Sequence, residues 1–149
     1  MLKPLFAFLS LSVLCASAMA QQCAITVEST DSMQYTVKNI DISKKCKEFE
    51  ITLKHTGKLP KAAMGHNLVI VKAADLAAAG ADAMSAGAAN DYIKPKDPRV
   101  LAYTKLIGGG ETASTKITVA NLDAKESYVF FCTFPGHSSL MKGTLKVIA

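Results

Sequence analysis

The chain has 149 residues, of which 17 are Lys or Arg and 12 are Asp or Glu, giving a formal net charge of +5. This length suits one domain of ordinary size. The basic residues are scattered along the sequence, whereas a nucleic-acid-binding protein gathers them on one stripe or face. The charge therefore excludes a nucleic-acid partner and bears on solubility and steering instead.

The first 20 residues have the pattern of a secretory signal peptide. Lys3 supplies a positive charge, residues 5–16 form an apolar stretch, and Ala18-Met19-Ala20 is an A-x-A-like cleavage site. The apolar stretch is shorter than the roughly 20 residues that a membrane-spanning helix needs. We therefore expect residues 1–20 to be removed, which leaves one exported domain over residues 21–149 with no membrane insertion.

The cysteines predict one disulfide and one free thiol. Cys15 lies in the apolar leader, where a lipid anchor is the alternative, although the preceding Leu14 is not the small residue that such signals prefer. The remaining three form an odd set, which needs an explanation in an exported chain. Because an oxidising compartment favours pairing, the simplest arrangement joins Cys23 to Cys46 and leaves Cys132 for a metal. Pairing of Cys132, with another thiol free, remains the alternative.

Short segments that favour strands dominate the rest of the sequence. Alternating apolar and polar residues predict strands with one buried face, and continuous apolar runs predict central strands. The alternating segments are 24–27, 34–37, 49–53 and 116–119, the continuous ones are 67–71 and 128–131, and the last strand is expected at 143–148. This pattern predicts an all-β fold, and specifically a β-sandwich.

One segment departs from the strand pattern. Residues 73–89 are rich in alanine, which favours a helix. Gly80 and Gly87 are expected to interrupt or end it, and residues 92–98, which contain two prolines, are expected to form a loop. The expected architecture is a sandwich with one short helical insert.

Three metal-binding side chains share one short segment near the C-terminus. Four residues separate Cys132 from His137, and three separate His137 from Met141. Each alone is ordinary, since a buried Cys or Met is usually a core residue. Together they offer a thiolate, an imidazole and a thioether, a soft set that favours copper over magnesium, calcium or manganese. Methionine also argues against a structural zinc site, whose ligands are Cys, His and acidic residues.

A trigonal copper site needs a second imidazole, and two histidines are available upstream. His66 lies beside Gly65 and just before an apolar strand, where a metal could approach the backbone closely. His55 follows another strand, a position more typical of a structural histidine. The local sequence favours His66, with His55 as the alternative.

These motifs closely resemble those of the azurins within the cupredoxin family. The resemblance rests on Cys132-x4-His137-x3-Met141 and on Met64-Gly65-His66-Asn67, and it covers nearly the whole mature chain. It extends to the early cysteine pair and to the segments 59–61, 104–108, 130–138 and 140–145. Loop lengths distinguish azurins from other cupredoxins, so the match is specific.

The resemblance implies a Greek-key sandwich with one type 1 copper at one end. His66, Cys132 and His137 would bind the copper equatorially. Met141 and the Gly65 carbonyl would be weak axial ligands. Such a centre cycles between Cu(I) and Cu(II) and transfers single electrons.

The resemblance also assigns hydrogen bonds around the thiolate. Asn67 and the main chain at Phe134 would donate to the Cys132 sulfur and tune the redox potential. One departure is the absence of tryptophan: many azurins carry one where Leu68 follows Asn67 here. This change affects packing and optical properties rather than the metal ligands.

The implied function is that of a periplasmic electron carrier and not an enzyme, because four side chains and a carbonyl leave no open position for a substrate. Its implied partners are redox proteins such as c-type cytochromes and periplasmic oxidoreductases. They would dock on a small apolar patch of the kind that suits brief encounters. The expected patch residues are Met33, Leu59, Ala63, Met64, Met84, Phe134, Pro135, Gly136 and Leu140.

Two other functional classes use similar residues. A copper chaperone or storage protein has soft ligands too, but it exposes them for transfer. A Cys–His hydrolase needs a third group to orient the base. No such residue stands out, and Met141 would have no role in that chemistry.

Overall fold

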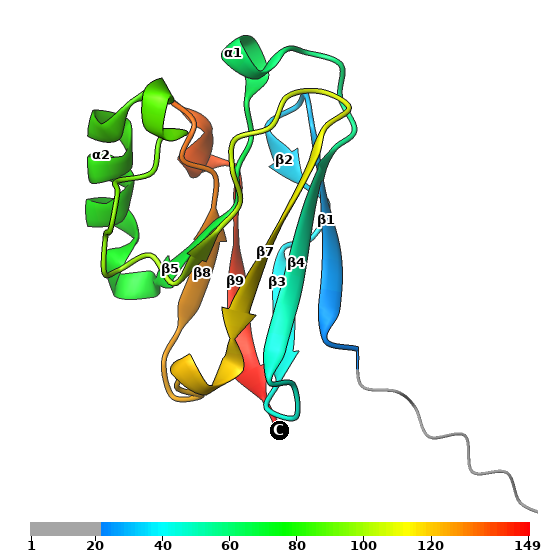
Figure 1. The fold of residues 1–149 in the computed structure, drawn as a ribbon, viewed down its shortest axis with the longest axis vertical. Helices are drawn as coiled ribbons and strands as arrows, with labels where there is room; N and C mark the ends of the chain where they lie inside the picture. The colour runs from blue at the N-terminus through cyan, green and yellow to red at the C-terminus, as the bar shows by residue number, and fades with distance from the viewer. Residues whose placement is uncertain (1–21) are drawn as a thin grey trace, which may run out of the picture.

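In the computed structural model, which describes residues 22–149, nine strands form two sheets that pack face to face (Figure 1). The first sheet has the order β2 (Gln34–Tyr35), β1 (Ala24–Thr30), β4 (Glu48–His55) and β7 (Thr112–Thr118). The second has the order β3 (Asn39–Ser43), β9 (Lys142–Ile148), β8 (Tyr128–Phe131), β5 (Val69–Lys72) and β6 (Ala102–Tyr103). The predicted β-sandwich is confirmed, and the expected leader, residues 1–20, lies outside the described residues.

Both sheets are mixed, since each contains one parallel strand pair as well as antiparallel pairs. β1 runs parallel to β4, and β3 runs parallel to β9, whereas the other strand pairs are antiparallel. Alternation within each strand sends one face inward, and the inward side chains of both sheets form one buried apolar cluster. Its members include Ile51 and Leu53 of β4 and Phe130 of β8. This rigid core holds the loops that leave its ends.

The helical insert packs on the outer face of the second sheet (Figure 1). A short 3₁₀ turn, Ala73–Asp75, precedes α2 (Leu76–Ala86). Gly80 does not interrupt this helix: it faces the Phe131 ring, which a Cβ there would meet at 3.7 Å. The helix ends at Gly87, whose φ of 71° suits glycine. Of the described helices, none is long and apolar enough to cross a membrane.

β8 spans the predicted residues 128–131, whereas several other strands begin or end at points that the sequence pattern did not give. β3 and the two-residue β6 were not predicted; β6 exists because it pairs with β5 at the sheet edge. β5 begins at Val69 rather than Asn67, because the Asn67 side chain, and not its backbone, accepts the hydrogen bond of the Thr133 N–H. At this end of the sheet a side-chain hydrogen bond takes the place of main-chain pairing.

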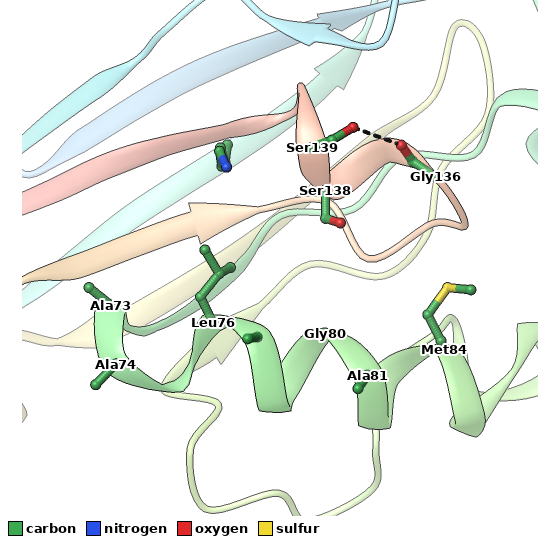
Figure 2. A pocket seen from close by; sticks show the side chains of 11 residues that line it. Ala73, Ala74, Leu76, Gly80, Ala81, Met84, Gly136, Ser138 and Ser139 are labelled. Atoms are coloured by element: carbon green, nitrogen blue, oxygen red, sulfur yellow. Dashed lines mark hydrogen bonds between the residues drawn. The ribbon is translucent and has the colours of Figure 1, made fainter.

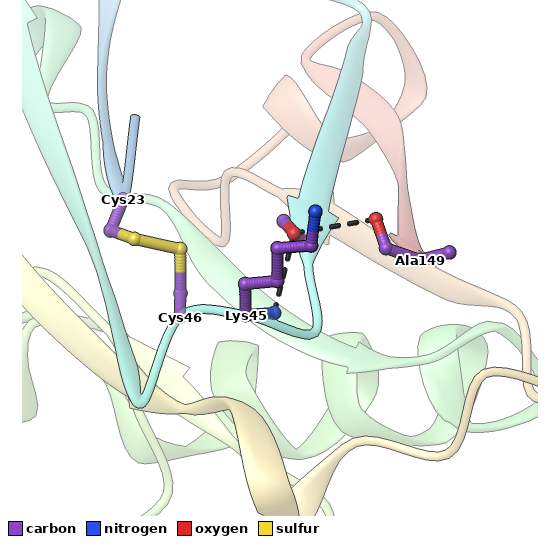
Figure 3. Close-up of a disulfide and its surroundings, with 5 residues drawn as sticks. Cys23, Lys45, Cys46 and Ala149 are labelled. Carbon is purple, nitrogen blue, oxygen red and sulfur yellow. Dashed lines mark hydrogen bonds between the residues drawn. A yellow bond between two sulfur atoms is a disulfide. The ribbon is translucent and has the colours of Figure 1, made fainter. Parts of the chain in front are cut away.

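A disulfide joins Cys23, just before β1, to Cys46, just before β4 (Figure 3). This confirms the expected pairing. Cys132 is free and buried among the described residues. The disulfide lies at the starts of two parallel strands, so it is at the opposite end of β4 from His55. It therefore cross-links the end of the sandwich opposite His55.

Replacing both Cys23 and Cys46 by alanine should lower the free energy of unfolding of the metal-free protein by about 3 kcal/mol, because the bond restricts the unfolded chain. Chemical denaturation measures this difference. Since the pair is remote from Cys132, the spectrum of the copper-loaded variant should match that of the wild type. Equal unfolding free energies for the two proteins would contradict the structural role of the disulfide.

Candidate metal centre

The loop after β8 reverses direction through a tight turn. The His137 N–H donates to the Phe134 carbonyl at 3.0 Å, and Gly136 has φ 80° and ψ −12°. With Pro135 before it, this is a type II turn, which needs glycine at its third position. The turn brings His137 back toward the end of β8, and so its imidazole toward Cys132.

Two further main-chain hydrogen bonds close this loop. The Met141 N–H donates to the His137 carbonyl at 2.8 Å, and the Cys132 N–H donates to the Met141 carbonyl at 3.0 Å. The Met141 side chain is fully buried. These main-chain hydrogen bonds fix Cys132, His137 and Met141 relative to one another independently of a metal.

His66 approaches from the other direction, between α1 (Lys61–Met64) and β5. Its N–H donates to the Ile107 carbonyl at 2.9 Å, and the Ile107 N–H returns a bond of 2.8 Å. The ring nitrogen Nε2 lies 2.9 Å from the Thr30 carbonyl. Because a carbonyl only accepts, Nε2 carries the proton and Nδ1 is left with its lone pair.

His66, Cys132 and His137 form one buried cluster. Their metal-binding atoms all lie within 4.8 Å of one another. The Cys132 sulfur is 3.7 Å from His137 Nδ1 and 3.9 Å from the Gly65 carbonyl oxygen. All three side chains are almost inaccessible to solvent, His137 being 3% exposed.

One ring nitrogen of the cluster is available to bind a metal. His66 Nδ1 is buried and has no hydrogen-bond partner among residues 22–149, an arrangement that is unfavourable unless something binds there. Burial lowers the pKa of His66 to about 4, so its ring is neutral at physiological pH and able to coordinate. Burial also lowers the pKa of His137.

The Cys132 thiol needs a cation to become a thiolate. Burial raises its pKa to about 11, although the main-chain N–H groups of Asn67 and Phe134 act in the opposite direction. The resemblance to azurins implies a role for the same two residues. Because the thiolate is the form that binds metal, an ion at this site must displace the proton.

Asn67 joins the two halves of the site. Its Oδ1 accepts from the Thr133 N–H at 2.8 Å, and its Nδ2 donates to Thr133 Oγ1 at 2.6 Å and to the Asp91 carbonyl at 3.0 Å. Asn67 follows His66 and Thr133 follows Cys132, so these bonds hold the two candidate ligands in register. Sequence reasoning missed Thr133, although it lies inside the recognised loop motif.

His55, the alternative second imidazole, lies behind the cluster and not in it. Its ring packs against that of His66 with centroids 4.3 Å apart, but it is not among the three metal-capable residues found in the described chain. Its Nε2 is 3.2 Å from Asp31 Oδ1 without the alignment of a hydrogen bond. Main-chain N–H donation from Lys58 is the largest cause of the lowered pKa of Asp31.

The expected patch residues all reach the surface. Leu59, Met84 and Leu140 are the most exposed of the large ones, at 41%, 51% and 55%. Ala63 and Gly136 are also exposed, and Met33, Met64, Phe134 and Pro135 are half-buried. The Phe134 and His137 rings lie 4.7 Å apart between centroids.

An open pocket connects α2 to the ligand loop (Figure 2). Met84 of α2 lines it together with Gly136, Ser138 and Ser139, and its volume is about 600 Å³. The helical insert and the loop that carries His137 are therefore neighbours on one face.

The sequence matches the family described as copper binding proteins, plastocyanin/azurin family, over residues 21–148. The chain belongs to this family. Copper is accordingly its cofactor, and the cluster of His66, Cys132 and His137 is able to hold it. The resemblance to azurins stated from the sequence is confirmed.

Individual members of the family match over almost their whole length. The chain is 55% identical to the azurin of Alcaligenes faecalis over 125 residues, covering 84% of this chain and 98% of that protein. It is 48% identical to the azurin of Pseudomonas aeruginosa over 145 residues, covering 97% and 98%. The solved structure of an azurin, Az-iso2, from Methylomonas sp. strain J superposes with a TM-score of 0.84 at 43% identity, covering 87% of this chain and all of that one.

Uptake of one copper ion at pH 8 should release about one proton, because the thiol with a pKa of about 11 is still protonated and His66, with a pKa of about 4, is already neutral. The yield should fall as the pH rises through 11. A weakly buffered titration with a pH indicator measures it, with Cys132→Ser as the reference for protons from hydrated copper. No difference between wild type and Cys132→Ser would contradict a protonated resting thiol.

Proposed function

We propose that this chain is an exported blue-copper electron carrier. The observation that carries the proposal is the buried cluster of one thiol and two imidazoles within 4.8 Å, in a member of the plastocyanin/azurin family. One thiolate and two histidines in a trigonal set, with a weak axial methionine, is the ligand set of blue-copper electron-transfer sites.

In this proposal His66, Cys132 and His137 hold the metal, and Met141 and the Gly65 carbonyl stand as weak axial ligands. The unpartnered Nδ1 of His66 and the position of Gly65, whose carbonyl is 3.9 Å from the sulfur, support these roles. Met141 supports its own role by its complete burial beside the loop that it closes. Bound copper would supply a one-electron couple between its cupric and cuprous states.

The chain's own residues limit rearrangement during electron transfer. Backbone bonds fix the Cys132–Met141 loop, the Ile107 bridge fixes His66, and Asn67 connects the two. The burial of all three candidate ligands excludes water. A rigid, dry ligand set supports a carrier and disfavours a chaperone, which exposes its ligands for transfer, and a catalytic site, which keeps a position open.

We also propose that the carrier works in the periplasm after residues 1–20 have been removed as a signal peptide. The disulfide between Cys23 and Cys46 supports an oxidising compartment. Its partners would be redox proteins such as c-type cytochromes and periplasmic oxidoreductases.

The docking surface would be the exposed and half-buried residues around His137. Phe134 packs against the His137 ring, and Met84 and Gly136 line the pocket between α2 and the loop (Figure 2). Exposed apolar side chains at the end of the molecule that holds the metal suit brief, low-affinity encounters.

Addition of copper(II) to the metal-free protein should produce an intense blue absorption that bleaches on reduction. Cys132→Ser should abolish the colour, because the thiolate is the source of the charge-transfer band. A protein that stays colourless and takes up only copper(I) would contradict the proposal and favour a chaperone.

Met141→Leu should keep most of the blue colour while the reduction potential changes, because a weak axial ligand tunes the site without forming it. Spectroscopy and voltammetry of the same sample check both properties. Complete loss of copper binding in this variant would mean that the thioether is a principal ligand.

Leu140→Asp should slow electron exchange with a c-type cytochrome about tenfold, because a carboxylate at the centre of an apolar contact must be desolvated. Ile148→Asp is the matched control, since Ile148 is 45% exposed and lies at the far end of β9 from the loop. Stopped-flow mixing measures the rates, and both variants should keep the wild-type potential. Equal slowing by the two substitutions would contradict docking at Leu140.

A further inference from the structure

A buried tyrosine outside the metal-binding motifs contacts the main chain next to a candidate ligand. Tyr35 is the second residue of β2, where it pairs with Ser29 of β1, and it is only 2% exposed. Its ring packs against that of Phe130, with centroids 5.5 Å apart and planes tilted by 49°. Nothing in the local sequence distinguishes it from an ordinary inward residue of an alternating strand.

The Tyr35 hydroxyl donates a hydrogen bond to the main-chain carbonyl of Asn67. The same peptide unit is held at its other polar group, because the Leu68 N–H donates to Thr104 Oγ1 at 3.0 Å. Both hydroxyls come from segments distant in the sequence, so the Asn67–Leu68 peptide plane is fixed from two sides. Asn67, Leu68 and Thr104 are completely buried, and no solvent replaces either bond.

The fixed peptide lies one residue beyond His66 and contains the carbonyl of Asn67. The Asn67 main-chain N–H acts on Cys132, and the Asn67 side chain holds Thr133. A rotation of the Asn67–Leu68 peptide would change the backbone angles of Asn67 and therefore the direction of these bonds. The orientation of the peptide thus bears on both sides of the metal site.

We propose that Tyr35 is a positioning residue for the copper centre, whose hydroxyl, together with that of Thr104, fixes the Asn67 main chain and so the hydrogen bond from Asn67 to the Cys132 sulfur. This inference rests on the proposed function. The hydroxyl remains a neutral donor, because burial raises the pKa of Tyr35 well above its ordinary value.

The chain contains a matched control for this hydroxyl. Tyr128 is also 2% exposed, and its hydroxyl accepts a hydrogen bond from the Asp123 N–H at 2.8 Å. It lies at the start of β8, four residues before Cys132, and its bond does not reach the metal site. Tyr128→Phe therefore removes a buried hydroxyl of the same kind without touching Asn67.

The test compares Tyr35→Phe with Tyr128→Phe in copper-loaded protein. Tyr35→Phe should retain copper, shift the charge-transfer band and lower the reduction potential, because a weaker hydrogen bond to sulfur destabilises the electron-rich reduced state. The reduced-to-oxidised ratio at a fixed applied potential should fall roughly threefold to tenfold. Tyr128→Phe should match the wild type in both properties. A Tyr35→Phe protein that equals Tyr128→Phe in band and potential would overturn the proposal.

Two further measurements keep the test decisive if Tyr35→Phe folds poorly or the metal behaves unexpectedly. Thr104→Val, which removes the acceptor of the Leu68 N–H in the same peptide, should change the reduction potential in the same direction. An unchanged potential would overturn the proposal that the two hydroxyls fix this peptide. In metal-free protein, hydrogen exchange at the Asn67 and Thr133 amides should be faster in Tyr35→Phe than in Tyr128→Phe. A wild-type protein that never turns blue would overturn the proposed function, while the exchange rates would still decide the role of Tyr35.

Discussion

The burial of the Cys132 sulfur is the constraint on which the rest of the structure depends. A thiol with a pKa of about 11 is inert as a ligand until a cation displaces its proton. The protein can keep that sulfur dry only because it lies at the end of a two-sheet core, behind Phe130 and Phe131. The same burial keeps His66 neutral, and its Nδ1 has no partner within the described part of the chain. Burial therefore makes the site unfavourable when empty, while the thiolate and imidazole ligands favour a soft metal.

Rigidity follows from how the two ligand-bearing segments are joined. One segment is a short loop closed on itself by backbone bonds between Cys132, His137 and Met141. The other is the single residue His66, held by Ile107 and Thr30. Asn67 connects them through its side chain, and its own main chain is held by the hydroxyls of Tyr35 in β2 and of Thr104, just after β6. A site built in this way supports the proposed electron carrier, which needs a ligand set that changes little between oxidation states.

The parts of this arrangement that could be predicted from sequence are those encoded locally. The loop spacing placed Cys132 with His137, and the position of Cys132 among candidate ligands left Cys23 and Cys46 as the expected disulfide. β3 alternates apolar and polar residues and was detectable, whereas the two-residue β6 exists only through its pairing with β5. Contacts such as Tyr35 with Asn67 cross 32 positions and depend on how the sheets pack. Hydroxyl donors of this kind carry no sequence signal, because a buried tyrosine in a strand is ordinary.

The most direct test of the central claim is X-ray absorption at the copper edge of the fully loaded wild-type protein. Bonding to the Cys132 thiolate predicts one sulfur scatterer at short distance together with two imidazole nitrogens, and nearly the same shell in oxidised and reduced samples. A first shell of nitrogen and oxygen alone, with the Cys132 thiol still open to alkylation in loaded protein, would contradict the account.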